Sequence, residues 1–146
     1  MKDLYNNIIG SMDFENQTIS ATQTAVEIDL AGCNSAVFFF AFGAEGGTLS
    51  ESLGWTVTMT HADDDGTGSA GDYASVAAKD VQGVTPDSGV IITLDDPAED
   101  STLYKVGYIG DKRFVKLLLT EVGSTTGIPV TILTVKSHLQ DVPVVS

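Results

Sequence analysis

The sequence has little of what a metal-binding, redox or nucleic-acid-binding protein needs. Its 146 residues include one cysteine, two histidines and seven lysines or arginines, against 20 acidic residues. The single cysteine, Cys33, excludes an intramolecular disulfide, and His61 and His138 lack partners at a zinc-ligand spacing. A formal net charge of -13 makes binding to a phosphate backbone unfavourable. We therefore expect no cofactor, no metal site and no nucleic-acid partner.

Long apolar runs are missing as well. No window approaches the roughly 20 apolar residues that a membrane helix needs. The residues after Met1 are mixed and polar, unlike the apolar stretch of a signal peptide. We therefore expect no membrane partner, and synthesis in a cytoplasm.

Catalytic motifs are also absent from the sequence. No Gly-x-Ser-x-Gly elbow occurs. The segment from Gly43 to Gly47 holds an acid and no lysine, which predicts a hairpin connection rather than a phosphate loop. The acidic run Asp63 to Asp65, before Gly66, lacks the alternating ligands of a calcium loop and predicts a turn. We expect a protein that is not an enzyme and has no catalytic residues.

Short β-type runs separated by Gly, Asp, Ser and Thr dominate the chain. Val26 to Leu30 alternates apolar and acidic residues, and Trp55 to His61 places Trp55 with Val57 and Met59 on one face. Ala36 to Phe42 (AVFFFAF) is apolar on both faces, which predicts a central strand with Phe39 buried. The predicted strands cover residues 26–30, 36–42, 55–61, 73–77, 90–94, 103–109, 114–121 and 129–135.

This pattern predicts an all-β fold, a single antiparallel β-sandwich or jelly-roll-like barrel of about eight strands with extended N- and C-terminal arms. Residues 1–23 are polar and unpatterned, and we assign them to an N-terminal arm. Residues 24–139 form the β-sandwich domain. Residues 140–146 form a C-terminal tail.

Charge is unevenly distributed along the chain. Residues 1–104 contain 17 acids and two lysines, whereas residues 105–146 contain three acids and five bases. The only basic cluster is Lys112, Arg113 and Lys116. These cations either pair with acids within the fold or meet an acidic partner, and the sequence leaves both alternatives open.

From Ala36 onward the order of elements resembles small virion proteins of tailed bacteriophages, which are usually encoded beside the major capsid protein. The matching segments are AVFFFAFGA, the turn at Asp64 to Gly66, YASVAAKDVQG (Tyr73 to Gly83), YKVGYIGDKRFVKLLL (Tyr104 to Leu119) and VTILTVKSHLQDVPV (Val130 to Val144). The segment YIGDKRFVK is the specific one. The tail departs from the family, because Lys136 to Leu139 replaces the usual Gly-His-Pro.

The resemblance implies a virion structural role on the capsid surface, with capsid decoration or cementing favoured. It implies the major capsid protein as partner, and a homo-oligomer, with a trimer favoured. Acidic loops would face outward and the terminal arms would order against neighbours. The candidate assembly contacts are Met1, Leu4, Tyr5, Ile8, Ile9, Phe14, Lys112, Arg113, Lys116, Val142, Pro143 and Val144.

Three alternatives stay open at this point. The chain could be a head-to-tail or tail component of the virion. It could be a carbohydrate-binding β-sandwich module, with Trp55, Tyr73 and Tyr108 as stacking residues, although alternation favours burial of Trp55. A hydrolase with an acidic cleft would need a carboxylate of strongly raised pKa in a pocket.

Overall fold

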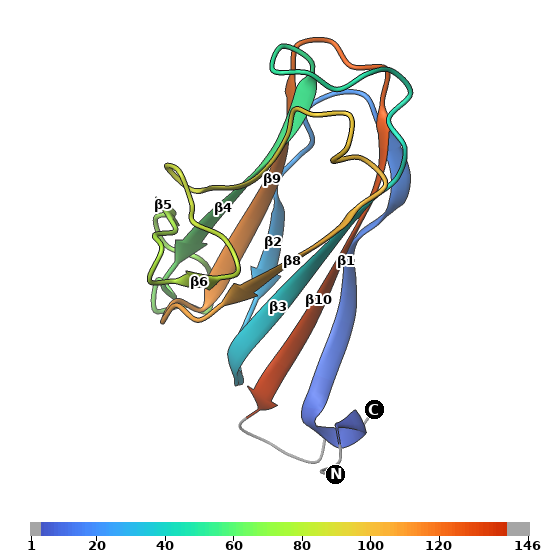
Figure 1. The fold of residues 1–146 in the computed structure, drawn as a ribbon. Coiled ribbons are helices and arrows are strands. Elements are labelled where there is room, and N and C mark those ends of the chain that lie inside the picture. The colour runs from blue at the N-terminus through green and yellow to red at the C-terminus, as the bar shows by residue number, and fades with distance from the viewer. Residues whose placement is uncertain (1–3, 140–146) are drawn as a thin grey trace.

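Two five-stranded antiparallel sheets lie face to face in the computed structural model, which describes residues 4–139 (Figure 1). Sheet A has the order β1 (Ile8–Ile19), β10 (Ile128–Leu139), β3 (Cys33–Phe42), β8 (Leu103–Tyr108) and β6 (Val81–Gln82). Sheet B has the order β2 (Val26–Asp29), β9 (Phe114–Val122), β4 (Gly54–Ala62) and β5 (Ala74–Ser75), and β7 (Val90–Leu94) also pairs with β4. A short 3-10 turn, η1 (Tyr5–Asn7), precedes β1. The predicted all-β sandwich is confirmed.

The strand order is that of a jelly roll. Its long strands form the neighbour sets β1-β10-β3-β8 and β2-β9-β4-β7. Each long strand is followed by one in the opposite sheet, except that β4 and β7 pair directly with each other. The two short strands β5 and β6 lie in the insertion between β4 and β7. Such double-sheet packing gives one core between the inner faces.

The core forms where the inward residues of the two sheets meet. Phe38 and Phe40 from β3, and Val57 and Met59 from β4, are fully buried. Trp55 is also buried, as its alternation with Val57 and Met59 predicts. Every second residue of these strands points inward, because a strand has a side-chain period of two.

The prediction of an N-terminal arm over residues 1–23 is wrong for residues 8–19. These residues form β1, which pairs antiparallel with β10 from Ile8↔Ser137 to Ile19↔Ile128. Phe14 and Ile19 are buried in the core. The register shifts between Met12 and Phe14 and again before Gln17, so irregular pairing interrupts the alternation that a sequence search relies on.

Strand β3 lies at the centre of sheet A, as predicted, but Phe39 is not in the core. Ala36, Phe38, Phe40 and Phe42 point inward and are buried, whereas Phe39 points to the opposite side and is only half-buried. No second layer of the described chain covers that side of sheet A. A strand that is apolar on both faces here has one face in the core and one at the surface.

The segment from Gly43 to Gly47 is not the predicted hairpin, because β3 and β4 belong to different sheets. It crosses between the sheets and is fixed by Glu45, which is nearly buried. The Glu45 carboxylate accepts hydrogen bonds from the backbone N–H groups of Gly47, Thr126 and Gly127. This single side chain therefore ties two connections together at one end of the sandwich.

The burial difference along β3 gives a direct test of the fold. Replacing Phe38 with alanine should lower the free energy of unfolding by about 3–5 kcal/mol, because it opens a cavity in the core. Phe39→Ala should cost about 1–2 kcal/mol, because only part of that ring is removed from water. Urea denaturation of both variants measures the difference. Equal losses would show that the two faces of β3 are assigned wrongly.

Candidate functional site

The basic cluster of the sequence lies where β8 passes to β9, and its cations are engaged within the fold. Lys112 Nζ lies 2.7 Å from an oxygen of Asp63. Arg113 bridges two carboxylates, with Nη2 2.7 Å from an oxygen of Asp29 and Nη1 bonded to Asp64. These contacts connect the ends of β2, β4 and β9.

Lys116 is engaged in the same way on the neighbouring strand. Its ammonium lies 3.7 Å from a Glu27 oxygen and 3.6 Å from the centre of the Tyr73 ring. The Tyr73 hydroxyl also donates a hydrogen bond to Glu27. Of the two alternatives that the sequence leaves open, pairing within the fold is therefore observed. A role of these residues as assembly contacts stays a prediction.

The ion pairs shift the pKa values of their carboxyl groups. The hydrogen bond from Arg113 holds the pKa of Asp29 below its ordinary value of 3.8. Backbone N–H groups of Gly68 and Gly66 lower the pKa of Asp64, and Arg113 adds to this effect. The hydrogen bond with Asp63 raises the pKa of Lys112. All of these groups are charged at neutral pH, so the cluster holds the loops together.

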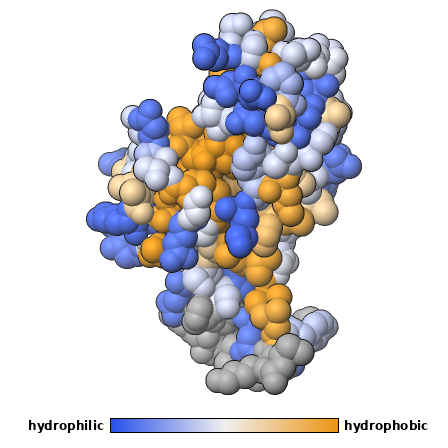
Figure 2. Space-filling view, in the orientation of Figure 1, coloured by the Kyte–Doolittle hydropathy of each residue, from blue (hydrophilic) through white to orange (hydrophobic). Residues whose placement is uncertain are grey.

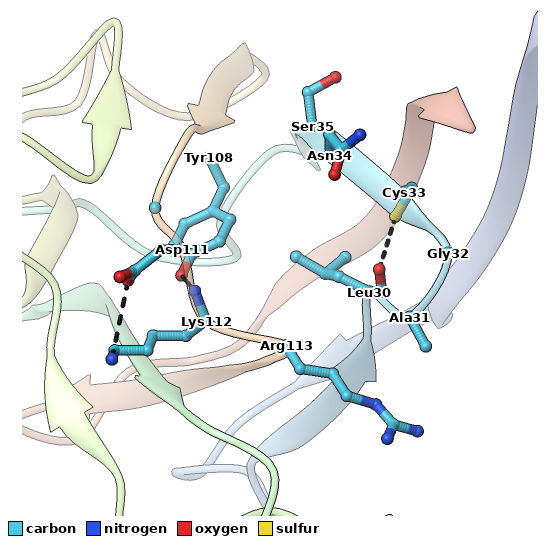
Figure 3. Close-up of a pocket in the computed structure, with 11 residues that line it drawn as sticks. Leu30, Ala31, Gly32, Cys33, Asn34, Ser35, Tyr108, Asp111, Lys112 and Arg113 are labelled. Carbon is cyan, nitrogen blue, oxygen red and sulfur yellow. Dashed lines mark hydrogen bonds and ion pairs between the residues drawn. The ribbon is translucent and has the colours of Figure 1, made fainter. Parts of the chain in front are cut away.

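A depression of about 390 Å³ lies beside this cluster, between the residues from Leu30 to Ser35 and those from Tyr108 to Arg113 (Figure 3). The Cys33 thiol bonds to the Leu30 carbonyl oxygen at 2.9 Å, and burial raises the pKa of the thiol. The Tyr108 hydroxyl lies 2.9 Å from His61 Nδ1 and accepts a hydrogen bond from the Lys112 N–H. Burial raises the pKa of Tyr108 to about 12. The polar groups named here serve the structure, and none is arranged as a nucleophile and base pair.

The acidic turn is held by its own backbone, as turn chemistry predicts. Asp64 Oδ1 accepts hydrogen bonds from the N–H groups of Gly66 and Gly68, and Asp65 Oδ1 accepts two from Thr67. Among the side chains of residues 4–137, no three His, Cys, Asp or Glu residues lie close enough together to hold a metal ion. The same residues include no helix long and apolar enough to cross a membrane.

A second surface, which the sequence did not identify, is the outward side of sheet A. We call it the outer face of sheet A. It carries apolar side chains from four neighbouring strands: Met12, Val37, Phe39, Leu103, Leu133 and Val135. Met12, Leu103 and Leu133 are 59%, 63% and 40% exposed. Figure 2 shows that hydrophobic residues reach the surface in the middle of the molecule in this view.

The residues on this face are aligned by strand register. Met12, Leu133, Phe39 and Lys105 lie side by side in one row across β1, β10, β3 and β8. The next row places Val135 and Val37 between two glycines, Gly10 and Gly107. Residues paired across strands point to the same side of a sheet. The rows therefore form one continuous apolar surface with a single cation, Lys105, in the middle rows.

The terminal residues that the sequence proposed as contacts have different environments. Leu4, Tyr5 and Ile9 are exposed by 67%, 81% and 41%, and Ile8 is half-buried. Phe14 is in the core, so the prediction that it forms an assembly contact is wrong: its side chain packs against the chain's own interior. Met1, Val142, Pro143 and Val144 lie outside the described residues.

The stacking residues of the carbohydrate-binding alternative do not form a platform. Trp55 and Tyr108 are only 1% and 2% exposed. Tyr73 is at the surface, but its ring is covered by the Lys116 ammonium. A sugar ring needs an open aromatic face for stacking, so this alternative has no support from the geometry.

No protein-family model matches the chain, and no curated protein matches it. Among solved structures, it is similar to the SPBc2 prophage-derived protein YomS, with 12% sequence identity and a TM-score of 0.50 over 89% of this chain and 92% of that chain. A Bacillus endospore appendage protein matches with 14% identity and a TM-score of 0.40 over 95% and 97% of the two chains. The Macrobrachium rosenbergii nodavirus P-domain matches with 12% identity and a TM-score of 0.33 over 90% and 92%. The likeness to YomS shows a shared fold.

The Arg113 bridge predicts how stability depends on pH. Because the pKa of Asp29 is lower in the folded chain, its contribution is fully present above the ordinary value of 3.8 and is lost as the pH falls through the folded value. The stability advantage of the wild type over Asp29→Asn should therefore shrink between about pH 5 and pH 2. Thermal melting at a series of pH values measures it. A constant difference would mean that the carboxylate charge contributes nothing.

Proposed function

We propose that this chain is a structural protein of a phage virion that binds the outside of the capsid and decorates or cements it. The role is one of protein binding, without catalysis. The observation that carries the proposal is the division of the surface. The outer face of sheet A is apolar and open, whereas most of the acidic residues, with their ion pairs, lie on the loops and on sheet B.

This division suits a decoration protein on physical grounds. Such a protein needs one face that loses water against a preformed lattice and another that stays hydrated. Exposed apolar patches that are rimmed by polar residues often mark interaction sites. The acidic loops would then remain in solvent and keep decorated particles apart by like-charge repulsion.

The fold and the sequence resemblance support the same role. Jelly rolls are common in capsid proteins, and a fold shared with a prophage-derived protein agrees with a phage origin. A fold alone does not determine a function, and the resemblance of the segment YIGDKRFVK adds support for capsid decoration. We further propose a homo-oligomer, with a trimer favoured, because several weakly binding copies gain avidity on a repeating lattice.

Copy number in purified particles tests this proposal. A decoration subunit should be present at a number comparable to that of the capsid protein, because every equivalent lattice position binds one. Quantitative mass spectrometry of purified virions against labelled peptides measures the ratio. A ratio near that of a connector ring, about a dozen copies per particle, would instead assign the chain to the head-to-tail junction or the tail. Absence from the particle would overturn the virion role.

A further inference from the structure

The two outward sheet faces of this sandwich differ in chemistry. The outward side of sheet B presents threonines of β4 (Thr56, Thr58 and Thr60) and the ion-paired Lys116 and Glu27. The corresponding rows of sheet A present Met12, Leu133, Phe39, Val37 and Val135. A strand whose outward side faces water normally carries polar residues there. Sheet B follows this rule except at Leu118, which is paired with Thr58, and sheet A does not.

Two exposed lysines of the described chain, Lys79 and Lys105, have no ion pair among residues 4–139, and Lys105 is the one on the outer face of sheet A. Lys112, Arg113 and Lys116 each lie within 4 Å of a carboxylate oxygen. Lys105 is exposed on the outer face of sheet A, paired in register with Phe39, and has no ion pair among residues 4–139. Its aliphatic chain can lie over the apolar surface while its ammonium group stays available for an ion pair. A carboxylate on another protein would complete the row.

Gly10 adds an independent observation. It lies in β1 beside Val135, on the same face. Its φ is not positive, and a methyl group added there would meet only the Thr134 carbonyl oxygen, 4.0 Å away. Neither the backbone nor the packing of this chain requires glycine at this position. Glycine within a strand often marks the close approach of another chain.

A second copy of this chain fits the face poorly. The patch spans four strands about 4.8 Å apart and five residues of about 3.3 Å each, so it covers roughly 300 Å². Two such patches would bury roughly 600 Å² in total, below the 1,200 Å² or so of a stable interface. Each copy also carries a net charge of -13, so a patch this small is not enough by itself to hold two copies together.

Resting on the proposed function, we infer that the outer face of sheet A is the surface that docks on the capsid. Its partner there is an apolar patch of the major capsid protein that places a carboxylate opposite Lys105. Phe39 and Leu133 lie at the centre of the contact, and Gly10 allows the close approach of the capsid chain. The contact is small for each copy, and it gains strength when copies linked in the proposed trimer bind the lattice together.

Co-sedimentation with shells assembled from the major capsid protein of the same phage tests this inference. Phe39→Ser should weaken binding by roughly thirtyfold, as expected for a central apolar anchor. Gly10→Thr should also weaken binding while its melting temperature stays equal to that of the wild type or rises, because threonine suits a strand better than glycine. The matched control is Thr58→Asp on the outer face of sheet B, which should bind like the wild type.

A charge test addresses Lys105 separately. Lys105→Glu should weaken binding by about tenfold at low ionic strength and by less at high ionic strength, because salt screens the repulsion from the partner carboxylate. Unchanged binding at low salt would show that the partner surface places no carboxylate opposite Lys105.

The remaining outcomes separate this inference from the function on which it rests. Failure of the wild type to bind shells would overturn the proposed function. Binding by the wild type together with equal binding by Phe39→Ser and Gly10→Thr would leave capsid binding intact and move the docking surface elsewhere. Sedimentation velocity tests whether a second copy of the chain binds this face. If the wild type self-associates and Phe39→Ser is monomeric, the face serves self-assembly and the inference is overturned.

Discussion

Two packed sheets can bury only one face each, and this constraint governs the rest of the structure. The inner faces take Phe38, Phe40, Val57 and Met59, which are completely removed from water. The outward side of β4 carries threonines. The outward side of β3 carries Val37 and Phe39 instead, so the chain has more apolar strand surface than its own fold can cover. The surplus lies on one side of the molecule, and for this reason we propose that side as the docking surface.

The electrostatics follow from the same arrangement. The loops at the strand ends hold most of the acids, and Arg113 joins Asp29 to Asp64 across elements far apart in the sequence. The cations of the basic cluster, which the sequence left open as contacts for an acidic partner, therefore hold acidic loops of the chain together. Lys105, which belongs to no cluster in the sequence, is the cation that the fold leaves at the apolar surface. The outer face of sheet A and the stabilising ion pairs are therefore separate.

Much of the fold could be predicted from the sequence, because inward and outward residues alternate along the regular strands. The burial of Trp55 and the central position of β3 follow from such patterns. Strand β1 could not be found, because its register shifts near Phe14 break the period of two. The surface on sheet A was missed for a different reason. A run such as AVFFFAF shows that both sides of a strand are apolar. It does not show whether another layer of the fold covers one side or both.

We propose that the capsid protein covers the outer face of sheet A in the assembled particle. An image of the decorated particle at side-chain resolution tests it most directly. Phe39 and Leu133 should then contact apolar side chains of the major capsid protein, with a carboxylate near Lys105, and the acidic turn at Asp63 to Asp65 should face solvent. A particle in which the outer face of sheet A points to solvent, or one in which the acidic turn contacts the capsid, would contradict the account.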